Sequence, residues 1–207
     1  TPTLPQVSQI LGTYGGDETH ACSGWASTNR ELTDEKRTRI PDFLKMLAEN
    51  GHHTPFEKSM LHFLVTCDIA THIHLIKHRI GVSVNAESAR YKELKDDKFY
   101  VPTDWPSIWA HNLESHMEQN YDLYHSCADS LTPLLGRKRA KESARFFLPY
   151  ANQITADVSF NFRSFMHFQG LRNDEHAQLE DQYIAQAMLE LVRQPGRFEY
   201  SLKAFGY

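Results

Sequence analysis

The segment from 104 to 131, DWPSIWAHNLESHMEQNYDLYHSCADSL, carries apolar residues at helical spacing over its whole length. This spacing predicts one long helix with an apolar side, and other parts of the chain have to cover that side. Pro106 favours a helix start near that residue, because the first turn of a helix has no need of its N–H group. The residues of the expected buried stripe are Trp109, Leu113, Met117, Tyr121 and Tyr124.

Further helices are predicted on both sides of this segment. One should span roughly 33–50, beginning at Thr33 and bending or restarting at Pro41. A second should run from about 70 to the basic residues 77–79 or end just before them, with Asp68 or Thr71 as its cap. Its expected buried residues are Ile69, Ile73 and Ile76. Two more helices are expected from about Arg137 to before Pro149 and over roughly 175–193.

Two segments alternate β-branched or aromatic residues with polar ones, which predicts strands. They are SMLHFLVTCDI at 59–69 and NQITADVSFNF at 152–162. Few strands and several long helices indicate the α+β class, with a small antiparallel sheet. The length of 207 residues and the absence of an obvious linker predict a single domain over 1–207.

Composition limits the classes of partner. Charged residues are 23% of the chain and the formal net charge is −4, which argues against nucleic acids and anionic membranes as partners. No stretch of about 18 apolar residues occurs, and TPTLPQVSQI lacks the features of a secretory signal. We therefore expect a cytoplasmic protein in which any site for an anion is local.

Cysteines and histidines give little support for a metal centre. Cys22, Cys67 and Cys127 are far apart and form no CxxC pair, so they are expected to be small buried residues. His74 and His78 have the i, i+4 spacing of metal ligands, but Leu75 stands where an HExxH motif has its glutamate. We expect no metal, and a metal-dependent hydrolase is a distant alternative.

The stretch KHRIGVSVNAESARY, residues 77–91, concentrates cations and hydroxyl groups after an apolar helix. Guanidinium forks and serine hydroxyls suit phosphate and ring oxygens, and a carboxylate suits sugar hydroxyls, so together they suit a nucleotide. The plain alternative is a solvated helix end whose cations favour the helix dipole.

Two other clusters accompany this stretch. In NFRSFMHFQGLRNDEHAQ, residues 161–178, cations and amides alternate with phenylalanines, which would hold a planar anionic ring by stacking and forked hydrogen bonds. A surface loop with structural ion pairs is the equal alternative. GHHTPFEK, residues 51–58, places polar groups in a turn before a strand and is a weak signal alone. No P-loop, GxGxxG or GxSxG motif is present.

In this order, HHTPFE, KHRIGVSVNAESARY, ARFFLP and NFRSFMHFQGLRNDEHAQ resemble the motifs of the flavin-dependent thymidylate synthases over roughly residues 20–185. The resemblance implies a homotetramer with active sites at subunit interfaces, each holding FAD and a deoxyuridylate. Methylenetetrahydrofolate and NADPH would be the co-substrates. The flavin contacts that it implies are Ser27, Thr54, Lys77, His78, Arg79, Asn161, Arg163 and His167. The nucleotide contacts that it implies are His74, Glu87, Ser88, Ala89, Arg90, Arg145 and Arg172.

Such an enzyme has to make C5 of uracil nucleophilic without a covalent bond to the protein. A guanidinium beside N3 and O4 of the ring would stabilise its anionic form, so we assign this catalytic role to Arg172. Ser88 is assigned to positioning and polarising the ring, since no base that would make it a nucleophile is evident.

Several residues depart from the family's pattern near the nucleotide or the flavin. Ile73 and His74 replace an Arg-Gln pair, Lys77 replaces an arginine, Ala86 replaces a glutamate, and His167 replaces an asparagine. Glu87 is the nearest substitute for the missing glutamate. These departures leave three readings: methylation of dUMP, action on another uridylate (UMP methylation or dUMP hydroxymethylation), or a non-catalytic nucleotide-binding protein.

Overall fold

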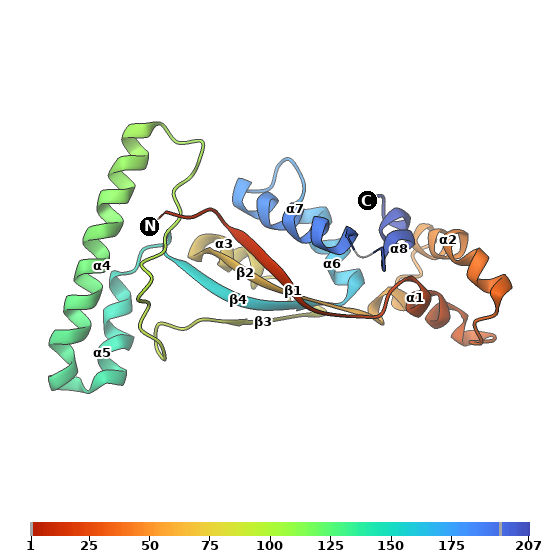
Figure 1. The fold of residues 1–207 in the computed structure, drawn as a ribbon, viewed down its shortest axis with the longest axis horizontal. Coiled ribbons are helices and arrows are strands. Elements are labelled where there is room, and N and C mark those ends of the chain that lie inside the picture. Colours follow the sequence, from red (N-terminus) through yellow and green to blue (C-terminus); the bar gives the residue numbers. More distant parts are fainter. Residues whose placement is uncertain (1, 195) are drawn as a thin grey trace. The chain divides into compact units, whose positions relative to one another are not determined.

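A computed structural model describes residues 2–194 and 196–207. In this part of the chain, four strands form one sheet in the order β1-β2-β4-β3 (Figure 1). Neighbouring strands of this sheet run antiparallel. The strands are β1 (Gln6–Tyr14), β2 (Met60–Asp68), β3 (Val82–Ala86) and β4 (Gln153–Phe160). The expected α+β class with a small antiparallel sheet is confirmed.

Residue contacts divide the chain into two compact units. Unit 1 contains the chain up to Gln6 and residues 65–77 and 85–156. Unit 2 contains residues 7–64, 78–84 and the chain from Asp157 on. The expectation of one domain over 1–207 stays a prediction.

The core of unit 1 lies along α4 (Ser107–Leu135), which packs beside the short α5 (Arg137–Ala144) (Figure 1). The expected long helix is therefore confirmed. Met117 and Tyr124 are fully buried, and Tyr121 is 3% exposed. Trp109 was expected in the same stripe but is 61% exposed, because it lies two turns before the first buried residue of the helix.

Strand β2 leads directly into α3 (Ile69–Leu75) in unit 1. Asp68 caps the helix, since its side chain accepts the N–H of Thr71 at 2.9 Å, and this confirms one of the two expected caps. The buried residues of α3 are Thr71 and Leu75, so the expected face was wrong. Ile76 is 45% exposed because the helix ends one residue earlier. The basic triplet 77–79 consequently follows the helix.

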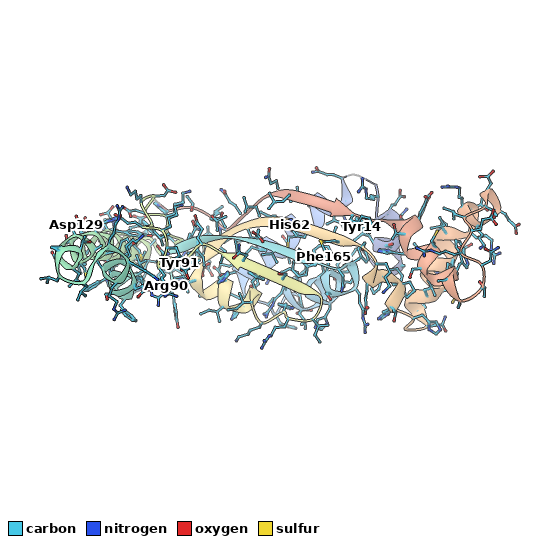
Figure 2. The ribbon with its side chains drawn as sticks, turned by 90° about the horizontal axis from the view of Figure 1, so that it is seen from below. Tyr14, His62, Arg90, Tyr91, Asp129 and Phe165 are labelled. Atoms are coloured by element: carbon cyan, nitrogen blue, oxygen red, sulfur yellow. The ribbon has the colours of Figure 1, made fainter. Side chains whose placement is uncertain are left out.

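In unit 2, α6 (Phe162–Arg172) packs its aromatic side against the sheet. Phe165 (labelled in Figure 2) lies 5.6 Å from Phe63 of β2 and 5.8 Å from Phe160 of β4 between ring centroids. Phe168 also contacts Phe160, with centroids 5.3 Å apart. Burial of these rings fixes which side of α6 faces away from the sheet.

In unit 2, three further helices pack against one another: α1 (Asp17–Gly24), α2 (Asp34–Glu49) and α8 (Glu199–Ala204). The helix α2 begins after Thr33 as expected, and it continues through Pro41 without a break. Fully buried His20 of α1 bonds Ser59 through Nε2 at 2.7 Å and Ser201 through Nδ1 at 2.8 Å. Burial lowers the pKa of His20 to about 3, so its ring is neutral.

The C-terminal helix is α7 (Leu179–Arg193), which begins four residues later than the expected start at about 175. Asp174 holds the preceding turn, because its side chain accepts the N–H of His176 at 2.9 Å. Sequence reasoning did not single out β1, β3, α1, α6 or α8. In the described part of the chain, no helix is long and apolar enough to cross a membrane.

Candidate functional site

The basic residues after α3 lie in a turn that leads into β3. Lys77 and Arg79 are exposed, whereas His78 is half-buried. Gly81 has φ +65°, and its carbonyl accepts the N–H of Asn161 at 2.9 Å. A Cβ atom at position 81 would lie 2.2 Å from Nδ2 of Asn161, so glycine allows this close approach. The segment from 78 to 81 is therefore fixed against the start of α6.

Arg172, the last residue of α6, is held by two side chains of unit 2. Its Nε–H donates to Nε2 of His78 at 3.1 Å, and its Nη1 lies 3.5 Å from Oδ2 of Asp181 in α7. A planar guanidinium that is bound at two of its nitrogens has a defined orientation. Three of its five N–H groups have no partner within the described residues. Arg172 is therefore placed to bind a further acceptor.

His78 accepts this bond as a neutral imidazole. Its ring packs against Phe168, with centroids 5.0 Å apart, and lies 6.2 Å from the ring of His167. Burial, followed by the positive charge of Arg172 and the neighbouring His167, lowers the pKa of His78 to about 4. Because Nε2 is the acceptor, the proton of the neutral ring is on Nδ1.

The charged or titratable residues between the phenylalanines of α6 lie on its exposed side. Arg163 and His167 are exposed, whereas Phe162, Phe165 and Phe168 are at most 2% exposed. The expectation that these rings stack on a bound heterocycle is wrong, because they fill the core. Residues three apart lie close to the same side of a helix, so this spacing fits one buried side.

The outer side of α6 meets the segment HHTPFE. Arg163 forms an ion pair with Glu57 of the 3-10 helix η2 (Thr54–Glu57), with Nη1 and Oε1 2.5 Å apart. Thr54 is exposed at the start of η2. Asn161 caps α6, since its Oδ1 accepts the N–H of Ser164 at 2.8 Å. Ser27, another expected flavin contact, is exposed at the end of η1 (Trp25–Ser27).

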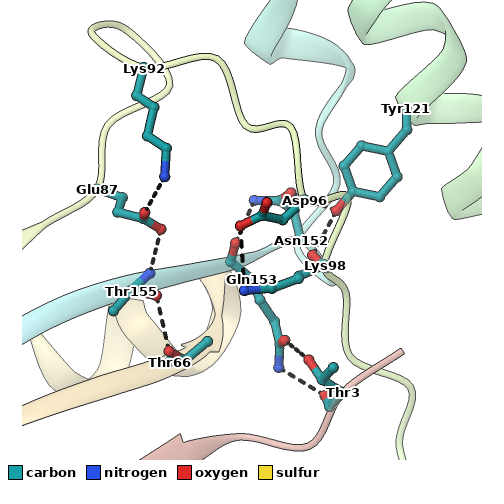
Figure 3. A network of polar contacts seen from close by, with 10 residues as sticks. All are labelled: Thr3, Thr66, Glu87, Lys92, Asp96, Lys98, Tyr121, Asn152, Gln153 and Thr155. Atoms are coloured by element: carbon teal, nitrogen blue, oxygen red, sulfur yellow. Dashed lines mark hydrogen bonds and ion pairs between the residues drawn. The ribbon is translucent and has the colours of Figure 1, made fainter. Parts of the chain in front are cut away.

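In unit 1, the residues of the expected nucleotide site form a tight loop after β3. Glu87 anchors the loop, as Figure 3 shows: Oε1 accepts from Nζ of Lys92 at 2.9 Å, and Oε2 accepts the N–H of Thr155 at 3.0 Å. The backbone N–H of Glu87 also donates to the carbonyl of Thr155 at 2.8 Å. Burial raises the pKa of Glu87, but the bonds from Lys92 and Thr155 outweigh it and lower the pKa overall. Glu87 therefore remains an anion within the fold.

A small cavity lies beside this anchor. Its volume is about 40 Å³, and Thr66, Glu87, Lys92, Asn152 and Thr155 are among the residues that line it. Such a volume suits an ordered water and is far below that of a nucleotide. The expected contact of Glu87 with substrate stays a prediction. Both oxygens of its carboxylate accept bonds from the protein, from Lys92 and from Thr155.

The loop itself places Ser88 and Arg90 at the surface of unit 1. Oγ of Ser88 accepts the N–H of Arg90 at 3.3 Å, which leaves its hydroxyl hydrogen free of any partner in the described residues. No base for a nucleophilic serine is thus present there. Arg90 (labelled in Figure 2) forms an ion pair with Glu142 of α5, which lowers the pKa of Glu142.

The remaining expected nucleotide contacts also belong to unit 1. Ala89 packs against the core that includes Leu94 and Tyr124, which ties the loop to α4. Arg145 is exposed in the 3-10 helix η3 (Arg145–Phe147), directly after α5. His74 is half-buried in the last turn of α3.

The expected site residues therefore form two groups. In unit 2 the structure brings Arg172 together with His78, and His78 with His167. In unit 1 it joins Glu87, Ser88 and Arg90 in one loop. Sequence reasoning missed Asp181, Lys92 and Glu142, each of which holds an expected site residue. A lysine five residues after Glu87 was a visible signal, but nothing in the pattern linked Asp181 or Glu142 to the arginines that they bind.

Both the sequence and the fold have known relatives. The family model described as "Thymidylate synthase complementing protein" matches residues 13–195. The "Flavin-dependent thymidylate synthase" of Pseudothermotoga lettingae is 31% identical over 189 residues, which cover 89% of this chain and 84% of that protein. The enzyme of the same name from Thermosipho africanus is 34% identical over 182 residues, with 78% and 75% covered.

The fold resembles that of a UMP/dUMP methylase, PolB of Streptomyces cacaoi, whose crystal structure was solved with bound 5-Br dUMP. The TM-score is 0.80 at 24% sequence identity, and the alignment covers 99% of this chain and 95% of that one. The match of the family model over most of the chain, together with relatives above 30% identity, settles the family. The chain belongs to the flavin-dependent thymidylate synthases, a family of methyltransferase-type enzymes.

Proposed function

We propose that this enzyme methylates a uridine monophosphate at C5 by reductive one-carbon transfer, with FAD as cofactor and methylenetetrahydrofolate and NADPH as co-substrates. The observation that carries the proposal is the guanidinium of Arg172, which is oriented by neutral His78 and retains three N–H groups for a ligand. The preferred acceptor is dUMP, as the names of the relatives suggest.

The chemistry of the exposed side chains fits a flavin dinucleotide. Arg79 and Arg163 are cations at the surface of unit 2, and Thr54 and Ser27 add hydroxyl groups. Cations and hydroxyl donors suit a diphosphate and its sugars, so these residues would hold FAD. The further flavin contacts by resemblance are Lys77, His78, Asn161 and His167. When bound, the flavin would receive a hydride from NADPH and supply one to the transferred carbon.

Arg172 would activate the pyrimidine. During the reaction the C5 proton leaves, a carbon–carbon bond forms at C5, and the transferred unit is reduced to a methyl group. Negative charge that develops on O4 of the ring would be stabilised by the remaining N–H groups of Arg172, which need no reorganisation because His78 already orients the guanidinium. Ser88 would donate its free hydroxyl hydrogen to the ring and keep it in place.

The phosphate of the nucleotide would be bound by Arg90 and Arg145. Arg145 is exposed, and Arg90 is paired with Glu142 at the surface, where an ion pair contributes little and exchanges readily. A dianionic phosphate would compete with one carboxylate for the same fork. Glu87 and Ala89 belong to the same loop. By resemblance, His74 of α3 completes the group of nucleotide contacts.

UMP as acceptor is the second candidate, because PolB is named as a methylase of both UMP and dUMP and was also solved with 5-Br UMP. We further propose a cytoplasmic homotetramer with sites at subunit interfaces, in keeping with the family resemblance, and no nucleic-acid or membrane partner.

Absorbance spectroscopy of the purified enzyme tests the flavin and the reaction together. The proposal predicts flavin bands, and NADPH oxidation that is faster with a uridylate than without one. A colourless protein that takes up no added FAD would overturn the cofactor assignment. Nucleotide binding without NADPH oxidation or product over hours would instead establish a non-catalytic nucleotide-binding protein.

A further inference from the structure

Asp181 binds Arg172 from a position that the family resemblance does not assign. It lies in the first turn of α7, and its side chain is 4% exposed, compared with 21% for the side chain of Arg172. The Oδ2 atom is 3.5 Å from Nη1 of the guanidinium. A carboxylate this deeply buried needs a positive or hydrogen-bonding partner, and Arg172 supplies the positive charge.

The two contacts of Arg172 act on different nitrogens. His78 binds Nε–H, and Asp181 binds Nη1. One contact would leave the planar group free to swing about that bond, whereas two contacts fix the plane and its rotation. His78 is neutral, so Asp181 is the contact that also offsets the charge of the guanidinium.

We propose that Asp181 is a positioning residue for catalysis, which holds the guanidinium of Arg172 in the plane from which its free N–H groups reach the pyrimidine. This inference rests on the proposed function. Asp181 would act by preorganisation, because donors that are fixed before the reaction stabilise developing charge better than donors that must reorient.

A purely structural role is the competing account. An acidic residue in the first turn of a helix favours the helix dipole whether or not it touches Arg172. Glu180 offers a matched control, since it is a buried carboxylate of the same turn, 7% exposed, and it accepts from Nε2 of Gln178 at 2.6 Å. Glu180→Gln therefore removes the same dipole interaction and leaves the bonds from Arg172 to His78 and Asp181 in place.

Steady-state kinetics of the holoenzyme separate the two roles. Asp181→Asn should lower kcat about tenfold or more while flavin content is unchanged, whereas Glu180→Gln should stay within about threefold of wild type. Adding Asp181→Asn to Arg172→Ala should change the residual activity by less than about twofold, because the carboxylate acts through the arginine. Equal losses in Asp181→Asn and Glu180→Gln, or full additivity with Arg172→Ala, would overturn the proposal.

Hydrogen exchange tests the geometry without substrate, cofactor turnover or a variant. In ¹⁵N spectra of the wild-type enzyme, the Nη1–H groups of Arg172, which face buried Asp181, should exchange more slowly than those of Arg163, which face Glu57 and whose side chain is 49% exposed. Equal exchange rates would contradict the positioning role directly. Slow exchange at Arg172 in an enzyme that converts no uridylate would refute the proposed reaction and leave the geometry intact.

Discussion

Nε–H of Arg172 donates to Nε2 of His78 across 3.1 Å, which joins residues 94 positions apart in the sequence. The turn before β3 and the end of α6 therefore act on each other directly. The neutral ring of His78 orients the arginine without adding a positive charge beside it. This relationship is the basis of the role that we propose for Arg172.

Arg172→Lys keeps the positive charge but removes the planar set of guanidinium N–H donors. We expect methylation to fall by about 100-fold or more, because an ammonium cannot be held by His78 and Asp181 and bind the pyrimidine in the same plane. Flavin absorbance should be retained. Arg193→Lys, at an exposed ion pair with Glu190 in α7, is the control and should behave as wild type. Loss of flavin in Arg172→Lys would show that this arginine holds the cofactor instead.

Glu87→Gln should loosen the loop that carries Ser88 and Arg90. The change removes the ion pair with Lys92 and weakens the acceptor for the N–H of Thr155. We expect the KM for the uridylate to rise several-fold, with a small loss of stability of about 0.5–1 kcal/mol, because this pair is partly exposed. Glu49→Gln, which breaks an exposed pair with Lys45 in α2, is the control. An unchanged KM in Glu87→Gln would argue against the anchor.

Gly81→Ala should destabilise the enzyme, because the new methyl group would meet the side chains of Asn161 and Ser164. Gly51 has a similar φ of +71°, but a Cβ atom added there would have no neighbouring atom within 4 Å, so Gly51→Ala carries the backbone strain alone. We expect Gly81→Ala to lower the free energy of unfolding by about 1–3 kcal/mol more than Gly51→Ala does. Urea denaturation measures both. Equal losses would mean that the turn does not depend on the close approach to α6.

His20 should make the stability of the enzyme depend on pH. Its pKa is about 3 in the folded state, below the ordinary 6.5, so its contribution is complete above pH 6.5 and is lost as the pH falls toward 3. The loss approaches about 1.4 kcal/mol per pH unit. His20→Asn removes this titration, so its stability should fall less steeply than that of wild type between pH 6.5 and 5. Parallel stability curves in that window would contradict a neutral buried ring.

The long helices and two of the strands could be predicted because their apolar residues follow one period over many positions. The helix over 107–135 and the strand over 60–68 are examples. Strand β3 was missed because its residues, Val82–Ala86, are few and all at least partly exposed. In α6, charged residues between phenylalanines suggested a ligand cluster, whereas the phenylalanines form a buried side and the charges an outer one.

The candidate site was predicted from motifs, and its supporting contacts were not. Resemblance selected Arg172 and His78, but the bond between them depends on how α6 and the turn before β3 pack. The roles of Asp181 and Glu142 were not predicted for the same reason, since the sequence around an acidic residue in a helix does not indicate which arginine it will bind. Tertiary contacts of this kind follow from the fold and have no signature at short range.

The mass of the nucleotide product is the most direct test of the proposed reaction. The purified enzyme is incubated with FAD, NADPH, methylenetetrahydrofolate and either dUMP or UMP, and the nucleotides are separated and weighed by mass spectrometry. The account predicts a product heavier than its substrate by one CH₂ group, formed with dUMP at the greater rate. A product heavier by CH₂O, or unchanged nucleotide in both reactions, would contradict C5 methylation by this enzyme.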